Sequence, residues 1–83
     1  MKKLESLNLS EKVTPELLTS MSVELVGMDI ALCPERIVEE YNLIRRDLAA
    51  LYRFNLITSE DLDELRDYVC EYMTDRLERW IKG

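Results

Sequence analysis

The sequence predicts an all-α protein, a small bundle of three helices built on an antiparallel helical hairpin of residues 34–53 and 59–81. Apolar residues recur at helical spacing in three segments, each segment opens with a helix-start signal, and the last two are about five residues apart. A chain of 83 residues has room for one domain. We therefore expect a single helical domain over residues 1–83, in which residues 1–13 form a flexible or short helical arm.

The first helix is expected to begin at Pro15, because Thr14 is a favourable N-cap and proline is tolerated at the first helical position. Its apolar stripe consists of Leu17, Leu18, Met21, Leu25 and Met28. Residues 22–32 also contain a strand-like alternation, and Gly27 weakens a helix by about 1 kcal/mol relative to alanine. Helix and strand therefore both remain open for this segment, and the helical interpretation ends the helix near residues 27–30.

The second helix is expected to start at Pro34, and its apolar residues follow a seven-residue repeat. These residues are Ile37, Tyr41, Ile44, Leu48 and Leu51. The third helix has the clearest start, because Thr58 can cap it and acidic residues fill its first turn. Its stripe comprises Leu62, Leu65, Val69, Tyr72 or Met73, Leu77 and Trp80.

The last two stripes match each other in an antiparallel hairpin, where the numbers of facing residues add to a constant. A single constant brings together four rungs: Leu51–Leu62, Leu48–Leu65, Ile44–Val69 and Tyr41–Tyr72. The same register predicts two exposed ion pairs, Arg46–Asp67 and Arg53–Glu60. The open side of the hairpin needs a cover. The first helix, which has its own apolar stripe, is favoured over a second copy of the hairpin.

One surface of the third helix carries more negative charge than the fold requires. Six carboxylates share an arc of about 80° and extend over roughly 27 Å, with no basic residue among them. They are Glu60, Glu64, Asp67, Glu71, Asp75 and Glu78, and we call them the acidic row. Like charges four residues apart destabilise a helix by about 0.2–0.5 kcal/mol per pair. The row is either an ordinary solvated face or a surface that contacts a basic site on another protein.

The composition disfavours several classes of function. The chain has no histidine and two cysteines, so we expect no catalytic residue, no metal site and no cofactor, with both cysteines reduced and packed in the interior. The formal net charge of −6 disfavours direct binding to nucleic acid and attraction to an anionic membrane. A small basic group on the second helix is surrounded by acids; it comprises Arg45, Arg46 and Arg53, with Glu39, Glu40 and Asp47 around it. No apolar segment has the length of a signal or membrane span, so a cytoplasmic location is expected.

These patterns favour a non-enzymatic protein-binding regulator or inhibitor whose acidic row occupies a basic site on a target protein, with Trp80 as a candidate anchor. In size and charge the chain resembles the small acidic helical inhibitors of phages and mobile elements, which include anti-CRISPR and other counter-defence proteins. That resemblance implies an inhibitory role. The alternative is an oligomeric structural or adaptor module that associates through its apolar seam. A monomer and a homodimer both remain open.

Overall fold

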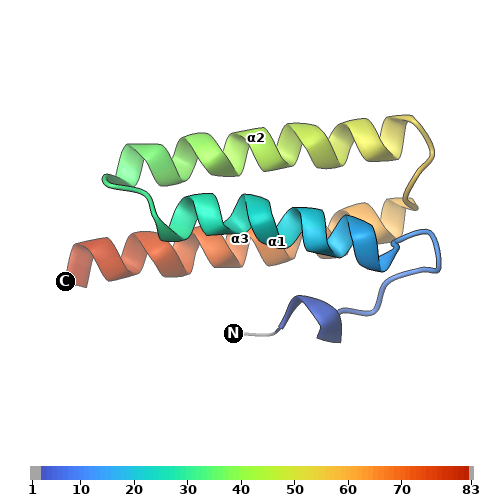
Figure 1. The fold of residues 1–83 in the computed structure, drawn as a ribbon, viewed down its shortest axis with the longest axis horizontal. Helices are drawn as coiled ribbons and strands as arrows, with labels where there is room; N and C mark the ends of the chain where they lie inside the picture. The colour runs from blue at the N-terminus through green and yellow to red at the C-terminus, as the bar shows by residue number, and fades with distance from the viewer. Residues whose placement is uncertain (1–2, 83) are drawn as a thin grey trace.

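A computed structural model describes residues 3–82 and confirms the three-helix architecture. A single-turn 3-10 helix, η1 (Leu4–Ser6), precedes the three α-helices α1 (Pro15–Asp29), α2 (Pro34–Arg53) and α3 (Ser59–Lys82) (Figure 1). The segment for which the pattern left helix and strand open is helical up to Asp29. The bundle measures 39 × 22 × 19 Å along its principal axes.

The predicted caps of α1 and α3 are formed by threonine side chains. The Thr14 hydroxyl accepts a hydrogen bond from the Leu17 amide at 3.2 Å, and the Thr58 hydroxyl accepts one from the Asp61 amide at 3.0 Å. Each bond satisfies an amide at the helix start that has no partner within the helix. Thr14 and Thr58, the N-caps predicted from the sequence, therefore form the observed capping hydrogen bonds of α1 and α3.

The end of α2 is a turn that reverses the chain into α3. Asn55 adopts a φ of 64°, in the left-handed region, which asparagine tolerates better than most residues. The Leu56 amide donates to the Leu51 carbonyl at 2.9 Å, and the Asn55 amide donates to the Tyr52 carbonyl at the same distance. These two bonds are the pattern of a Schellman helix end, and they direct the connection back along α2.

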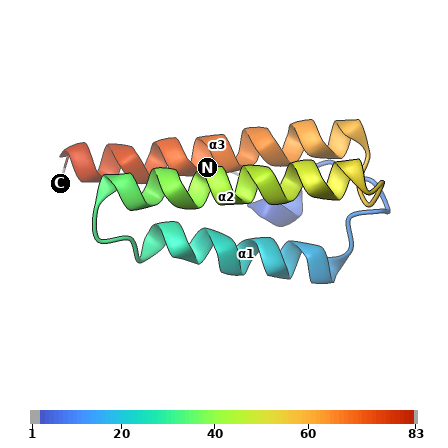
Figure 2. The same ribbon diagram turned by 90° about the horizontal axis from the view of Figure 1, so that it is seen from above.

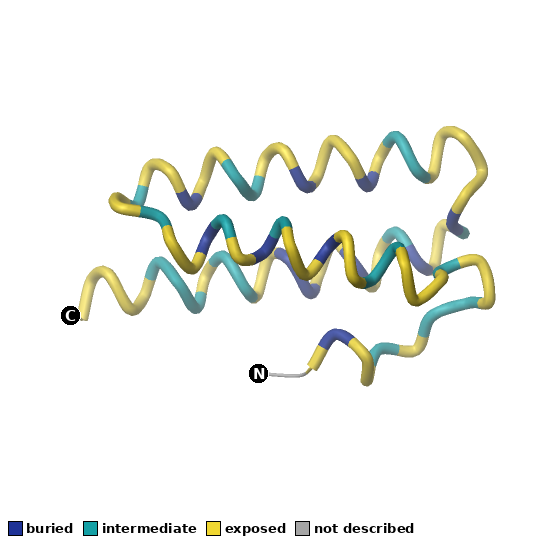
Figure 3. Tube along the Cα trace, in the orientation of Figure 1, coloured by how far each residue is buried: buried dark blue, intermediate teal, exposed yellow. Residues whose placement is uncertain are grey.

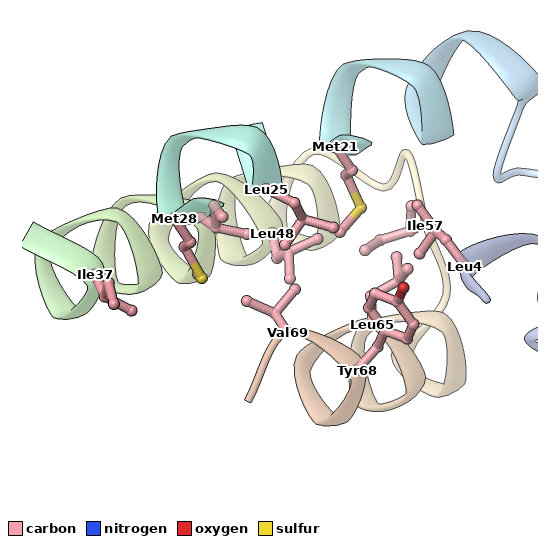
Figure 4. Packing of buried hydrophobic residues seen from close by; sticks show 11 residues of the cluster. Leu4, Met21, Leu25, Met28, Ile37, Leu48, Ile57, Leu65, Tyr68 and Val69 are labelled. Atoms are coloured by element: carbon pink, nitrogen blue, oxygen red, sulfur yellow. The ribbon is translucent and has the colours of Figure 1, made fainter. Parts of the chain in front are cut away.

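The core lies where α1 covers the seam of the α2–α3 hairpin (Figure 2). Its buried members are Met21, Leu25 and Met28 from α1, Ile37, Ile44 and Leu48 from α2, and Leu65, Tyr68 and Val69 from α3 (Figure 4). The two middle rungs of the expected register consist entirely of buried residues, whereas the two outer rungs are partly buried. Buried positions lie on the sides by which the helices face one another (Figure 3).

The N-terminal segment, residues 3–14, packs against the end of the bundle where α3 begins. Leu4 is buried and joins the same core cluster as Ile57 and Tyr68. Asp61 is only 2% exposed. Its carboxylate accepts hydrogen bonds from the Ser10 amide at 2.7 Å, from the Ser10 hydroxyl, and from the Thr58 amide at 3.0 Å. One buried carboxylate thus ties the arm to the start of α3.

Two expectations about exposed side chains are wrong. Arg46–Asp67 and Arg53–Glu60 are not among the ion pairs of residues 3–82. The reason for the first is that Asp67 lines a hollow formed by α3 alone, whereas Arg46 lines a different hollow between α2 and α3.

The two cysteines, Cys33 and Cys70, are free, as expected, but both are exposed and neither packs in the core. Cys33 precedes the first residue of α2, outside the apolar stripe of that helix, and Cys70 lies next to the buried Val69 on α3.

Candidate functional site

The acidic row occupies one side of α3. Five of its carboxylates are exposed, namely Glu60, Glu64, Asp67, Glu71 and Glu78, whereas Asp75 is partly buried. All six come from one uninterrupted helix, so their spacing is set by helical geometry. The row extends over roughly 27 Å from end to end.

The five exposed carboxylates are not balanced by basic side chains of the described chain. No lysine or arginine within residues 3–82 forms an ion pair with any of them. Asp75 differs, because its carboxylate pairs with Arg76 and also with Arg79, the latter at 3.2 Å. The row therefore presents five uncompensated negative charges and one compensated charge.

A shallow hollow of about 480 Å³ lies beside the C-terminal part of the row, from Asp67 to Glu78. Its lining residues are Asp67, Cys70, Glu71, Thr74, Asp75 and Glu78. All of them belong to α3, so neither α1 nor α2 covers this side of the helix. A partner can therefore approach the four carboxylates of this hollow without displacing α1 or α2.

Trp80 does not share a surface with the row. It follows Glu78 by two residues, which is about 200° of helix rotation. Trp80 lines a different hollow, of about 590 Å³, together with Met28, Asp29, Arg76 and Arg79. Trp80 and the acidic row therefore lie on different sides of α3.

A polar network that the sequence patterns do not predict joins α1 to α3 beside Trp80. Arg76 Nε lies 2.5 Å from an Asp29 carboxylate oxygen, the Tyr72 hydroxyl donates to that carboxylate at 2.8 Å, and the Arg76 guanidinium stacks 4.2 Å from the centre of the Tyr72 ring. Burial alone would raise the pKa of Asp29, but the hydrogen bonds from Arg76 and Tyr72 outweigh it and hold this pKa below its ordinary value. The network holds Arg76 in place, and Arg76 in turn pairs with Asp75 of the row.

The structure adds a third arginine, from α3, to the basic group that the sequence places on α2. Arg66 of α3 joins α2 residues around a hollow of about 370 Å³, lined by Asn42, Arg45, Arg46, Ala49 and Arg66. Two acids that were expected to surround this group lie toward α1 instead: a Glu40 oxygen lies close to Gly27, and Asp47 shares a hollow with Glu24. Arg66 also pairs with Asp63 at 3.6 Å, so acidic and basic side chains remain neighbours on this part of α3.

Glu24 of α1 faces the acidic side chains of α2. Partial burial, a hydrogen bond with Asp47, and the charges of Asp47 and Glu40 raise the pKa of Glu24 to about 7. The folded state therefore binds the proton of the Glu24 carboxyl more tightly than the unfolded chain does. The stabilisation of the fold by this proton is complete below about pH 4.5. It is lost as the pH rises through about 7.

We expect Glu24→Gln to remove this loss, because the glutamine amide can donate to Asp47 at every pH. Urea unfolding should show the variant more stable than the wild type by about 1 kcal/mol at pH 8, a figure reduced for solvent screening. The two proteins should be nearly equal at pH 5. Glu16→Gln, at an exposed position of α1, serves as the control and should show no change in stability between pH 6 and 8 beyond that of the wild type. An identical pH profile for Glu24→Gln and the wild type would contradict the assignment.

Comparison of the chain with protein-family models, with curated proteins and with solved structures found no match. Within residues 3–82, no three acidic or cysteine side chains are arranged to hold a metal ion. None of the helices formed by these residues is both long and apolar enough to cross a membrane.

Proposed function

We propose that this protein is a non-enzymatic regulator or inhibitor that binds a basic site on another protein through its acidic row. The observation that carries the proposal is the set of five exposed carboxylates on α3 that have no basic partner within residues 3–82. Such a row weakens the helix by about 0.2–0.5 kcal/mol for each like-charge pair four residues apart. No ion pair within residues 3–82 offsets that cost at the five exposed carboxylates, whereas a basic partner would.

The geometry of the row favours an elongated target site. Carboxylates at intervals along roughly 27 Å of one helix can pair with lysines and arginines that line a groove. A groove of that kind commonly receives a polyanion such as nucleic acid, and a bound acidic helix would exclude it. This is the inhibitory form of the proposal, and it agrees with the size and charge that the chain shares with counter-defence inhibitors.

The experiment that tests the proposal combines Glu64→Lys, Asp67→Lys and Glu71→Lys in one chain. The three changes turn attraction into repulsion at the centre of the row, so partner affinity should fall about 30-fold or more. Folding should be retained, because Glu64→Lys and Glu71→Lys stand four residues from Glu60 and Asp75 and form favourable helix pairs, while positions 67 and 71 only exchange one like-charge pair for another. Affinity capture from the native cell, followed by mass spectrometry and titration of the captured partner, measures the loss.

The matched control reverses three acids outside the row, Glu11→Lys, Glu35→Lys and Asp63→Lys, all at exposed positions. Its net charge equals that of the row variant, so it separates a local contact from a general charge effect. The control should retain the partner, and heparin, a polyanion, should compete with the wild type for it. Equal binding by the row variant and the wild type would overturn the proposal.

Association through the apolar seam, the alternative considered from the sequence, has less support. The seam of the α2–α3 hairpin is occupied by Met21, Leu25 and Met28 of α1, all of which are buried. A second copy could reach the seam only if α1 left it. Self-association would therefore need a different apolar surface.

A further inference from the structure

A hollow lined by three arginines lies between α2 and α3, and no residue of α1 lines it. Its volume is about 370 Å³, and its lining residues are Asn42, Arg45, Arg46, Ala49 and Arg66. We call this feature the arginine hollow. No carboxylate lines it, although the chain has 17 acidic and 11 basic residues. Average composition therefore does not account for a hollow whose only charged lining residues are positive.

The rest of the bundle neutralises these arginines only weakly. Within residues 3–82, Arg45 and Arg46 form no ion pair. Arg66 contacts Asp63 at 3.6 Å, but both side chains are more than half exposed, so water competes with this pair. The two glutamates of the preceding turn of α2 contact Arg36 instead. The guanidiniums of the arginine hollow are therefore available to an external anion.

Two helices hold the arginines of the hollow in place relative to each other. Arg45 follows the buried Ile44 in the chain, and Arg66 follows the buried Leu65, so the packing of the hairpin core fixes the backbone beneath them. The Arg45 guanidinium lies 5.5 Å from the centre of the Tyr41 ring, a cation–π contact. Burial raises the pKa of the Tyr41 hydroxyl, and the charges of Arg45 and Arg66 act against that rise. Guanidiniums from both helices therefore lie near one hydroxyl group.

We infer that the arginine hollow is a binding site for a phosphate monoester. A guanidinium donates two parallel hydrogen bonds to phosphate oxygens, and the Asn42 amide group can donate another. A phosphate monoester carries a charge of about −1.5 to −2 at pH 7 and three acceptor oxygens, so it can engage arginines of both helices at once. A carboxylate or a phosphodiester carries one negative charge and matches these donors less well. The net charge of −6 opposes every anion, so binding depends on the local donors.

Two kinds of ligand present a phosphate monoester: a phosphorylated side chain of another protein, and a small phosphorylated compound such as a nucleoside monophosphate. All five lining residues of the arginine hollow are exposed. The hollow therefore contacts the phosphate group and leaves most of the ligand outside. Both kinds of ligand make the same phosphate contact, and the experiment includes one of each.

Nuclear magnetic resonance titration of the isotope-labelled chain tests the site. The probe is phenyl phosphate, and the matched control is phenyl sulfate, which has the same shape but a single negative charge. Phenyl phosphate should shift the side-chain Nε–H signals of Arg45, Arg46 and Arg66, with a dissociation constant on the order of 1 mM. It should bind about 10-fold more tightly than phenyl sulfate, because its second charge strengthens each pairing. A phosphoserine peptide and adenosine monophosphate are titrated in the same way, and the tighter ligand identifies the source of the phosphate.

Two substitutions on different helices locate the contact. Arg46→Gln and Arg66→Gln should each weaken the binding of phenyl phosphate about 10-fold, because each removes charge-assisted hydrogen bonds. Arg53→Gln removes the same charge from an exposed position of α2 outside the hollow, and it should change the affinity about 2-fold or less. Glutamine is a good helix former, so all three variants should keep the circular dichroism of the wild type.

Asp63→Asn should strengthen the binding of phenyl phosphate about 2-fold, since its carboxylate then no longer competes for Arg66. Signals that still shift linearly at about 20 mM phenyl phosphate would overturn the inference, as would equal affinity for phenyl sulfate or equal weakening by Arg53→Gln. A single-stranded oligonucleotide that binds more tightly than both monoesters would also overturn it, because its internal phosphates are diesters. The arginine hollow shares no lining residue with the hollow beside the acidic row, so this test and that of the proposed function can fail separately.

Discussion

Asp61→Asn is expected to lower the free energy of unfolding by about 3 kcal/mol at pH 7, because it breaks a fully buried set of charge-assisted hydrogen bonds. The carboxylate of Asp61 accepts from the amide and hydroxyl of Ser10 and from the amide of Thr58. An asparagine side chain has only one acceptor oxygen, so it must direct its amide group toward at least one of these donors. Urea unfolding followed by circular dichroism measures the change.

The matched control for this substitution is Asp63→Asn, two residues further along the same helix. Asp63 is exposed, and its only ion pair within residues 3–82 is a 3.6 Å contact with Arg66. Its replacement should change the unfolding free energy by less than about 0.5 kcal/mol. If the two variants were equally stable, the Asp61 carboxylate would not be holding the N-terminal arm.

The effect of Asp61→Asn on the free energy of unfolding should depend on pH. Burial alone would raise the pKa of Asp61, but the hydrogen bonds from Ser10 and Thr58 outweigh it and hold this pKa below its ordinary value. A depressed pKa in the folded state stabilises the protein above the pKa of the unfolded chain, about pH 4, and this contribution is lost as the pH falls further. The stability difference between the wild type and Asp61→Asn should therefore shrink between pH 5 and pH 3.

Ile44→Ala is expected to destabilise the protein by about 3 kcal/mol, because it removes buried methyl groups from the centre of the α2–α3 seam and leaves a cavity. Ile44 is 1% exposed, whereas its neighbour Leu43 is 47% exposed. Leu43→Ala should therefore cost no more than about 0.5 kcal/mol. Chemical denaturation of both variants tests the hairpin register, since a shift of α2 by one residue would exchange the two costs. Equal destabilisation by the two substitutions would contradict the register.

The hairpin was predictable from local patterns. The stripes of residues 34–53 and 59–81, the caps at Thr14 and Thr58, and the short connection are all properties of neighbours in the chain. Helical periodicity and capping act over one or two turns, so the sequence states them directly. The alignment of the six carboxylates on α3 is predictable for the same reason, because one helix carries them all.

Contacts between distant segments could not be read in this way. Asp61 appears in the sequence as one more acid in the first turn of a helix, and its burial depends on Ser10, which lies 51 residues away. The Asp29–Arg76 pair and the grouping of Arg66 with Arg45 likewise depend on how separate helices pack. Periodicity does not determine which exposed face another segment covers.

The sequence by itself determined the three helices, their ends and the negative charge along α3, because these follow from interactions between residues a few positions apart. Only the tertiary structure decided which charges remain uncompensated. It tied Asp75 to Arg76 and Arg79, placed Trp80 away from the row, and left Val23 and Val26 of α1 exposed. These outcomes depend on how α1 is rotated against the hairpin. That rotation is set by packing over the whole core, and no local pattern specifies it.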